Sequence, residues 1–301
     1  MKSFLEHIAN RLSPHAVPEE AAGARADPRV DVDYAGLDGQ PLRGHWYAPA
    51  GSGPFPVVVA VHGGGWQVGA PDHYQHIGPW LARRGYAVLA ASYRLARPGN
   101  PTWPGAVRDV CAAVQYVKAN AAKLKVDRER VALLGDSAGG HLASLVALGG
   151  DGEPFAAAAA GGPPVSTAVK VVAAAYGVYD LYAQWEHDLA LRPRDSIVEK
   201  FLGVSAIEDK RPYLEASPLW RVSSRASSTA FFLAWGDGDD IVDCRSQSEA
   251  FLRALKHAGH YVRTCVFPAA PHFWLVDPLE DAGSYSAVFA ARLLRFLQAR
   301  L

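Results

Sequence analysis

The sequence predicts an α/β fold in which helices flank a mostly parallel central sheet, with a small cap inserted before the penultimate strand. Short apolar runs lack the polar-apolar alternation of a half-exposed strand, so both faces of each strand are expected to be covered. Between these runs lie segments whose apolar residues recur at helical spacing. This alternation of strands and helices is typical of a three-layer α/β sheet. The buried strands are predicted at residues 57–61, 86–93, 131–134, 169–175, 230–235 and 261–267.

Residues 1–28 are predicted to form a short helix and a loose arm, ahead of one domain at residues 29–301. Four apolar residues share one face of that helix: Phe4, Leu5, Ile8 and Leu12. Polar residues interrupt the stretch, so it does not resemble the apolar core of a signal peptide. The segments "RVDVDYAG" and "PLRGHWYAP" then alternate polar and apolar residues around Asp38-Gly39, which predicts a hairpin.

One connection is too long for a simple crossover. It runs from Asp180 to Ser228, and a connection of that length inside a compact domain usually carries structure of its own. We therefore predict a small cap at about residues 181–227. The stretch 156–164, rich in alanine, glycine and proline, is predicted to be a surface loop. Helices are predicted from apolar spacing over residues 105–123, 246–258 and the last segment of the chain.

Composition excludes several classes of partner. Thirty basic residues balance thirty acidic ones in the 301-residue chain, so no excess charge points to nucleic acid or to an anionic membrane. No apolar stretch is long enough to span a bilayer. Cys111, Cys244 and Cys265 are odd in number and far apart, which suits a reducing compartment and no metal site. We expect a cytoplasmic protein with no nucleic-acid or membrane partner, and nothing in the sequence specifies its oligomeric state.

The stretch "VALLGDSAGGHLASLVALGG" changes from a strand-like run to a helix-like run at a polar, glycine-rich junction. "GDSAG" fits the pattern G-x-S-x-G between a strand and a helix, the context of a nucleophile elbow. Ser137 would sit on a sharp turn with its hydroxyl above the sheet, and side chains at Gly135 and Gly139 would collide with backbone. A glycine-rich turn with an incidental serine is the alternative interpretation of these five residues alone.

The second motif, "HGGGW" from His62 to Trp66, directly follows the strand at 57–61. Its glycines allow backbone N–H groups to converge on one point, where they could stabilise the charge of a tetrahedral intermediate by roughly 3 to 4 kcal/mol per donor. We assign the oxyanion hole to the N–H groups of Gly64, Gly65 and Ala138.

A serine nucleophile needs a base and an acid that orients the base. In this architecture the acid should follow the next-to-last strand and the histidine should follow the last strand. "PAAPHFW" after the last strand offers only His272. "AWGDGDDIVD" after the strand before it offers four carboxylates: Asp237, Asp239, Asp240 and Asp243.

These motifs, together with "SYRLA", "YGVYD" and "ASPL", resemble the α/β-hydrolase superfamily over about residues 30 to 300. The resemblance is to hormone-sensitive-lipase-like carboxylesterases with an HGGxW motif, close to bacterial feruloyl-esterase-like domains. The acid of that family lies in a pattern G-x-x-D-x-x-V, which selects Asp239 here, with Asp240 one register step away. The sequence departs from the family after "YRLA" and in "APHFW", where the family's glycine before the histidine is replaced.

The other histidines are expected to be structural. His62 would hold the oxyanion loop through a hydrogen bond, and His141 would point into the packing around the elbow. His257 and His260 end a predicted helix and are expected to be solvated.

The function implied is ester hydrolysis through an acyl-enzyme on Ser137, with Asp239 and His272 completing the triad and with no metal or cofactor. The substrate is expected to be a small-molecule ester with a short-chain or aromatic acyl group, held by Trp66, Tyr182 and Trp185. Aromatic residues of a cap can equally form its own small core.

Two alternatives remain open. An amidase of the kynurenine-formamidase kind shares HGGxW. A non-catalytic binding module is the remote alternative, because such modules lack a triad residue and every position is filled here.

Overall fold

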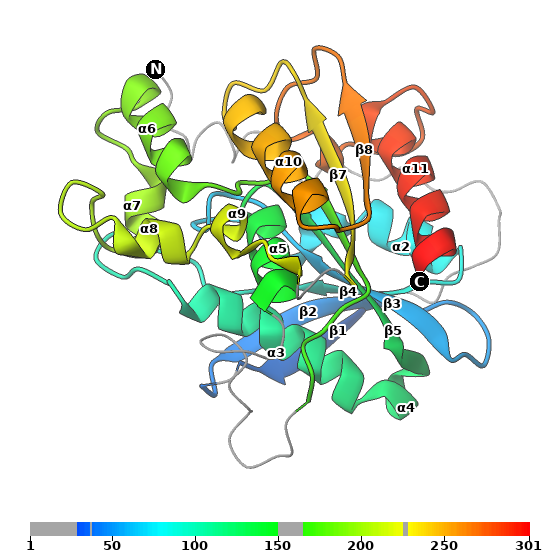
Figure 1. The fold of residues 1–301 in the computed structure, drawn as a ribbon. Helices are drawn as coiled ribbons and strands as arrows, with labels where there is room; N and C mark the ends of the chain where they lie inside the picture. The colour runs from blue at the N-terminus through cyan, green and yellow to red at the C-terminus, as the bar shows by residue number, and fades with distance from the viewer. Residues whose placement is uncertain (1–28, 37, 150–164, 225–227) are drawn as a thin grey trace.

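The computed structural model describes residues 29–36, 38–149, 165–224 and 228–301. The predicted N-terminal helix and arm at 1–28, and the predicted loop at 156–164, lie outside these ranges. The described residues form one eight-stranded sheet with helices on both faces (Figure 1). The predicted fold class is confirmed.

The sheet has the strand order β1-β2-β4-β3-β5-β6-β7-β8. A hairpin of β1 and β2 pairs antiparallel with β4, as the alternating hairpin sequence predicted, and the other strand pairs are parallel. The strands are β1 Val30–Ala35, β2 Pro41–Tyr47, β3 Phe55–Val61, β4 Ala87–Ala91, β5 Val126–Asp136, β6 Val171–Ala175, β7 Ala230–Gly236 and β8 Val262–Phe267.

Five of the predicted buried strands are covered on both faces, but β8 is not. It lies at the edge of the sheet and pairs only with β7, and within it only Cys265 and Phe267 are buried. Val266 is 44% exposed. The expectation of full burial for 261–267 was wrong because an edge strand has a neighbour on one side only.

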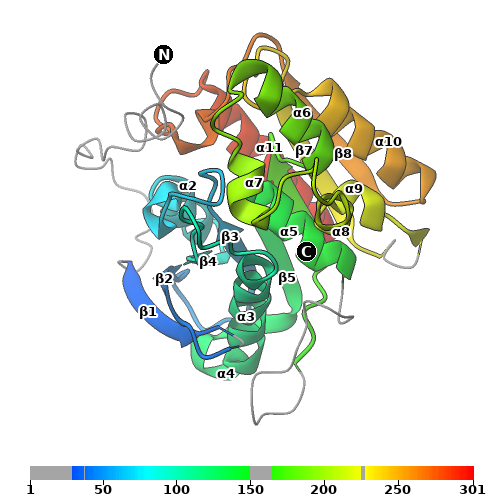
Figure 2. The ribbon, with the colours of Figure 1, turned by 90° about the vertical axis from the view of Figure 1, so that its left-hand side faces the viewer.

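Two hydrophobic layers hold the helices on the sheet. Val57, Val59 and Val61 face one layer, whereas Val58 and Ala60 face the other, as the two-residue period of a strand requires. The first layer carries α3 Gly105–Ala119, α5 Ala138–Gly149 and α10 Ala250–His257, and the second carries α2 Ile77–Ala82 and α11 Tyr285–Arg300 (Figures 1 and 2).

Two predicted helices are interrupted. The helix predicted over 105–123 is split at Asn120 into α3 and the short α4 Ala121–Leu124. The helix predicted over 246–258 begins with a π-helical turn, η3 Arg245–Glu249, before α10. Among the described residues, no helix is both long and apolar enough to cross a membrane.

The long connection between β6 and β7 is helical, and it lies against α5 and α10 (Figure 1). Asp180 caps the first of its helices by accepting hydrogen bonds from the N–H groups of Tyr182 and Ala183. Ser196 caps the second, and Gly203 ends it in the left-handed conformation. The helices are α6 Leu181–Leu191, α7 Ile197–Leu202, α8 Arg211–Glu215 and α9 Pro218–Arg221.

Strand register brings the polar motifs to one edge of the sheet. Val61 at the end of β3 is level with Gly135 in β5, and Gly236 at the end of β7 is level with Phe267 in β8. Because these strands are parallel, the segments that follow them all emerge on the same side.

Candidate active site

Ser137 lies between the end of β5 and the start of α5, with φ of +51°. A non-glycine residue in this left-handed region costs of order 1 to 3 kcal/mol, and such residues persist where the surroundings enforce them. The Ser137 N–H donates to the carbonyl oxygen of Ala175 (2.9 Å). A Cβ on Gly139 would lie 1.8 Å from the carbonyl oxygen of Val61, so the tight turn needs glycine there, as predicted.

Three side chains from separate segments meet at this turn. His272 Nε2 lies 3.0 Å from Ser137 Oγ, and His272 Nδ1 lies 2.6 Å from Asp239 Oδ2. Since a carboxylate only accepts hydrogen bonds, Nδ1 carries the proton and Nε2 is left to accept from the serine hydroxyl. All three side chains are nearly enclosed.

Asp239 is the carboxylate that contacts His272, among the four that the sequence offers. Its second oxygen, Oδ1, accepts from the N–H groups of Ile241 (2.9 Å) and Val242 (3.0 Å), which fixes the carboxylate in a tight turn. The Asp240 backbone oxygen instead lies 3.2 Å from His187 Nε2 of α6.

Asp237 and Asp243 have other partners. Asp237 accepts from the N–H of Ala269, and Asp243 accepts from Ser246.

The "HGGGW" segment forms a tight loop with Gly64, Gly65 and Trp66 all at positive φ. The N–H groups of Gln67 and Val68 both donate to the carbonyl oxygen of Gly64 (3.1 Å each). Within the described residues, no acceptor engages the N–H of Gly64 or Gly65. These two donors are available to a ligand.

Ala138 is the first residue of α5, where a helix leaves its N–H groups without an internal partner. The predicted oxyanion donors therefore come from two segments that follow neighbouring strands, β3 and β5.

Trp66 was predicted to contact substrate, but its side chain is fully buried. Its indole stacks on Phe201 of α7, with ring centroids 4.6 Å apart. Its Nε1–H donates to His141 Nδ1 (3.1 Å), and His141 Nε2 donates to the carbonyl oxygen of Ala216 (2.7 Å). Trp66 thus joins the oxyanion loop to α5 and α7, and substrate contact by this residue stays a prediction.

His141 is held neutral in this arrangement. Its Nδ1 must accept from Trp66, and burial lowers the pKa of His141 to about 3. The expectation that it points into the packing around the elbow matches its contacts.

His62 bonds to the carbonyl oxygen of Gly63 (2.8 Å), in keeping with the role expected for it in the loop. His257 is exposed. His260 is not solvated as expected: it is 5% exposed and contacts the carbonyl oxygens of Thr229 (3.3 Å) and Ser223 (3.1 Å). The prediction failed because the residues before β7 fold back over the end of α10.

Tyr182 and Trp185 pack within the helical segment itself. Their rings stack 5.6 Å apart, and both contact Tyr213 edge-on. Trp185 Nε1 donates to Glu199 (2.7 Å), and Lys210 donates to the Tyr182 hydroxyl (3.1 Å). These contacts form a small core, and substrate contact by either residue stays a prediction.

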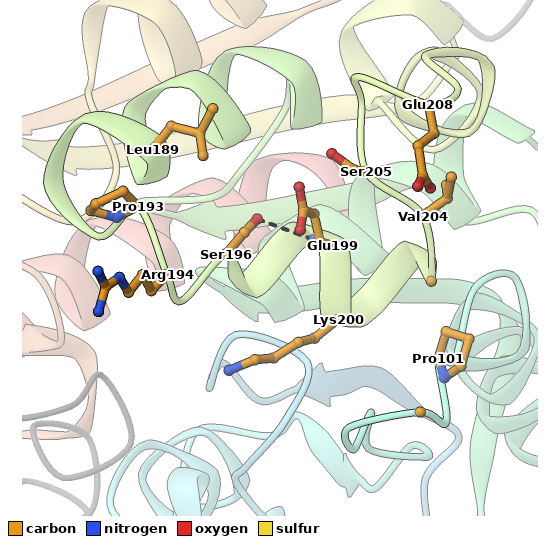
Figure 3. Close-up of a pocket in the computed structure, with 12 residues that line it drawn as sticks. Pro101, Leu189, Pro193, Arg194, Ser196, Glu199, Lys200, Val204, Ser205 and Glu208 are labelled. Carbon is orange, nitrogen blue, oxygen red and sulfur yellow. Dashed lines mark hydrogen bonds between the residues drawn. The ribbon is translucent and has the colours of Figure 1, made fainter.

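A cavity of about 620 Å³ lies between the loop at 99–101 and the α6–α7 connection (Figure 3). No residue of the predicted triad lines it. Its charged residues have both signs, and Ser196 and Glu199 are joined by the α7 cap. The labelled lining residues include Pro101, Arg194, Lys200, Val204 and Glu208.

The sequence reasoning gave no role to Asp136, His73, Tyr74 or Tyr176. Tyr176 has φ of +38°, and its ring centroid lies 4.5 Å from that of His272. Its hydroxyl accepts from the N–H of Leu275 (3.1 Å) and so steadies the segment after His272. Of these four residues, only Asp136 could have been noticed in the sequence, because it is a charged residue at the end of an apolar strand.

Within the described residues, no group of three or more His, Cys, Asp or Glu side chains could hold a metal ion.

Comparison with known proteins agrees with this geometry. Residues 46–255 match the model of the BD-FAE family. The probable carboxylic ester hydrolase LipM of Mycobacterium tuberculosis is 32% identical over 211 residues, which cover 69% of this chain and 46% of LipM. The kynurenine formamidase of Danio rerio is 26% identical, over 87% of this chain and 80% of its own length.

The fold is shared with solved esterases. Propionate-bound esterase 2 of Thermogutta terrifontis matches with a TM-score of 0.73 at 24% identity, covering 90% of this chain and 94% of that chain. The predicted resemblance to α/β-hydrolase esterases is confirmed. The chain spans about half the length of the mycobacterial relatives that it matches.

Proposed function

The chain belongs to the BD-FAE family, and on that premise we propose that it is a serine carboxylesterase that acts through an acyl-enzyme on Ser137. The observation that carries the proposal is the pair of contacts at His272, 3.0 Å to the Ser137 hydroxyl and 2.6 Å to Asp239. The mycobacterial relatives described as ester hydrolases support the same class.

In this mechanism Ser137 Oγ attacks the ester carbonyl carbon while His272 Nε2 takes the serine proton. Asp239 keeps the other ring nitrogen protonated and stabilises the imidazolium that forms. The N–H groups of Gly64, Gly65 and Ala138 bind the carbonyl oxygen as it becomes an oxyanion.

His272 then gives its proton to the leaving alcohol. In the second half of the reaction it takes a proton from water, which attacks the acyl-enzyme and releases the acid and free Ser137.

The acyl group is proposed to be short or aromatic. Ser137 is 5% exposed and His272 is 2% exposed, and such a closed site favours a compact acyl group over a long chain. The helical segment at about 181–227 is proposed to act as a small cap. Support comes from its contacts with the oxyanion loop at Trp66–Phe201 and with α5 at His141–Ala216.

A cytoplasmic location belongs to the same proposal. Cys244 and Cys265 are free thiols, as expected of a protein from a reducing compartment.

Replacing the nucleophile tests the proposal. Ser137→Ala should abolish both the burst of p-nitrophenol from p-nitrophenyl acetate and labelling by a fluorophosphonate probe, because it removes the hydroxyl that lies 3.0 Å from His272 Nε2. Ser144→Ala is the matched control, since Ser144 lies in α5 and its hydroxyl bonds only to the Gly140 carbonyl oxygen (2.7 Å). Near-wild-type turnover by Ser137→Ala would refute the assignment, and an unlabelled wild type would favour a binding module.

The amidase alternative is supported by the similarity to kynurenine formamidase over most of both chains. The kcat/KM values for aryl acetates and for N-formylkynurenine separate the two functions. An esterase should prefer the acetates, and a preference for N-formylkynurenine would replace the proposal with the amidase.

A further inference from the structure

Asp136, the residue before the predicted nucleophile, places a fully buried carboxylate against the start of the oxyanion loop. A Cβ on Gly63 would lie 2.4 Å from Asp136 Oδ2, so the loop backbone approaches the carboxylate as closely as glycine allows. The Gly63 N–H donates to Asp136 Oδ1 (3.1 Å). The orientation of this carboxylate is therefore coupled to the path of the backbone that leads to Gly64 and Gly65.

Tyr74, at the end of the 3₁₀ turn η1 Pro71–Tyr74, contacts the same carboxylate. Its hydroxyl lies 2.9 Å from Asp136 Oδ1 and 2.8 Å from the carbonyl oxygen of Val61. A phenol has one proton, so Tyr74 cannot donate fully to both oxygens.

The other carboxylate oxygen, Oδ2, faces His73 of the same turn. His73 Nε2 lies 3.2 Å from it, at ion-pair distance but without hydrogen-bond alignment, and both side chains are buried. The two atoms thus meet at ion-pair distance without a hydrogen bond.

A buried carboxylate is costly unless an opposite charge accompanies it. The titratable groups that face Asp136 are His62, His73, Tyr74, Tyr93 and Tyr176. Burial lowers the pKa of His62 to about 4, so this imidazole is neutral. Burial raises the pKa values of the three tyrosines, which stay protonated.

Among these groups, His73 is the one placed at ion-pair distance from Asp136, with 3.2 Å between Nε2 and Oδ2. Burial alone would raise the pKa of Asp136, but the electrostatic attraction of His73 and the hydrogen bond from Tyr74 keep this pKa below its ordinary value.

We propose that His73 is a positioning residue for the oxyanion hole: its imidazole ring, at ion-pair distance from Oδ2, holds the Asp136 carboxylate in the orientation that binds the Gly63 N–H. The Gly64 and Gly65 N–H groups are thereby presented to the developing oxyanion. The inference rests on the proposed serine-hydrolase function, because it concerns how that site is held.

His73→Gln tests the proposal, since glutamine keeps a polar side chain but removes the imidazole ring that faces Asp136. At pH 6.5 we expect kcat for p-nitrophenyl acetate to fall about tenfold while KM stays within about twofold, less than the 10²- to 10³-fold typical when an oxyanion donor is removed. Affinity for an aryl trifluoromethyl ketone, whose hemiketal oxyanion uses the same N–H groups, should fall by a similar factor. His76→Gln is the matched control, because His76 makes no side-chain cap hydrogen bond at the start of α2.

Asp136→Asn separates positioning from mere packing. Asparagine can still accept from the Gly63 N–H but leaves no carboxylate for His73 to orient. Adding His73→Gln to Asp136→Asn should therefore lower kcat less than twofold, and two independent tenfold losses would overturn the proposal.

A His73→Gln variant with the kcat and the ketone affinity of the wild type would also overturn the proposal. If that variant does not fold, His73→Asn replaces it with the same expected loss of kcat and ketone affinity, and wild-type values in His73→Asn would overturn the inference. Fluorophosphonate labelling of wild-type Ser137 keeps the tests distinct, because an unlabelled Ser137 defeats the proposed function, whereas a labelled enzyme indifferent to residue 73 defeats only this inference.

Discussion

Ser137 shows how a single residue can be held in an unfavourable conformation by its surroundings. Its backbone lies in the left-handed region because β5 ends at Asp136 and α5 begins at Ala138, with no residue to spare between them. The hydrogen bond from Ser137 N–H to Ala175 ties this turn to the next strand. The hydroxyl is consequently directed at His272 before any substrate binds, which reduces the reorganisation that the reaction needs.

Asp239→Asn should lower kcat by about three to four orders of magnitude, because an amide in place of the carboxylate no longer holds His272 in the tautomer that accepts from Ser137. Asp240→Asn is the matched control at the neighbouring position, where only the backbone oxygen contacts His187. The measurement is kcat for p-nitrophenyl acetate with both variants. If Asp240→Asn were the slower variant, the acid would have to be reassigned.

The choice between these two neighbours shows the limit of sequence reasoning at the residue scale. The motif pattern favoured Asp239, but a shift of one residue would have favoured Asp240. The backbone turn that Asp239 closes with Ile241 and Val242 decides which carboxylate reaches the imidazole. Such a turn depends on the path of the chain and cannot be deduced from composition.

At the scale of elements, the elbow depends on close contact between α5 and the end of β3. Gly139 is the point of contact, because a Cβ there would lie 1.8 Å from the Val61 carbonyl oxygen and 2.7 Å from that of His62. Both atoms belong to backbone that leads into the oxyanion loop. The contact at Gly139 therefore fixes both the packing of α5 against β3 and the path of the backbone that leads into the oxyanion loop.

Gly139→Ala should destabilise the protein by about 3 kcal/mol or more, because neither backbone can move without disturbing the sheet. Gly140→Ala is the neighbouring control, since a Cβ there would meet its nearest atom, the Gly177 Cα, at 3.1 Å. Urea unfolding followed by circular dichroism measures both variants. Equal stability of the two would mean that α5 can shift away from β3 without cost.

Element boundaries were predicted where the local pattern alone determines them. The apolar runs located the six strands β3 to β8, and the alternating pattern around Asp38-Gly39 located β1 and β2. The pattern could not show that β8 is an edge strand, since its position depends on which strands pair. Nor could it show the break at Asn120, where α3 gives way to α4.

At the scale of the whole molecule, the two hydrophobic layers enclose histidines that are neutral in the fold. Burial lowers the pKa of His62 to about 4 and that of His141 to about 3. In the unfolded chain both would titrate near 6.5. Between pH 6.5 and 4 the unfolded state therefore binds more protons than the native state, so stability must fall as the pH falls.

We expect the free energy of unfolding to decrease by about 1.4 kcal/mol per pH unit for each of these histidines below pH 6.5. Buried Asp188, whose pKa is raised by burial, works in the opposite sense near the acid end of this range. The measurement is a series of urea titrations between pH 7 and 4.5. The slope should be smaller in His141→Gln and unchanged in His257→Gln, where the replaced residue is exposed; a pH-independent wild type would contradict the buried, neutral state of both rings.

The amino-acid sequence by itself determined the strand-helix alternation, the elbow, the glycine loop and the short set of polar residues from which a triad could be drawn. These features depend on local spacing, which a linear pattern records. Only the tertiary structure decided that His272 meets Asp239 and Ser137, that Trp66 is buried against Phe201, and that His73 faces Asp136. Each of those relations joins segments distant along the chain, and strand order and register bring them together.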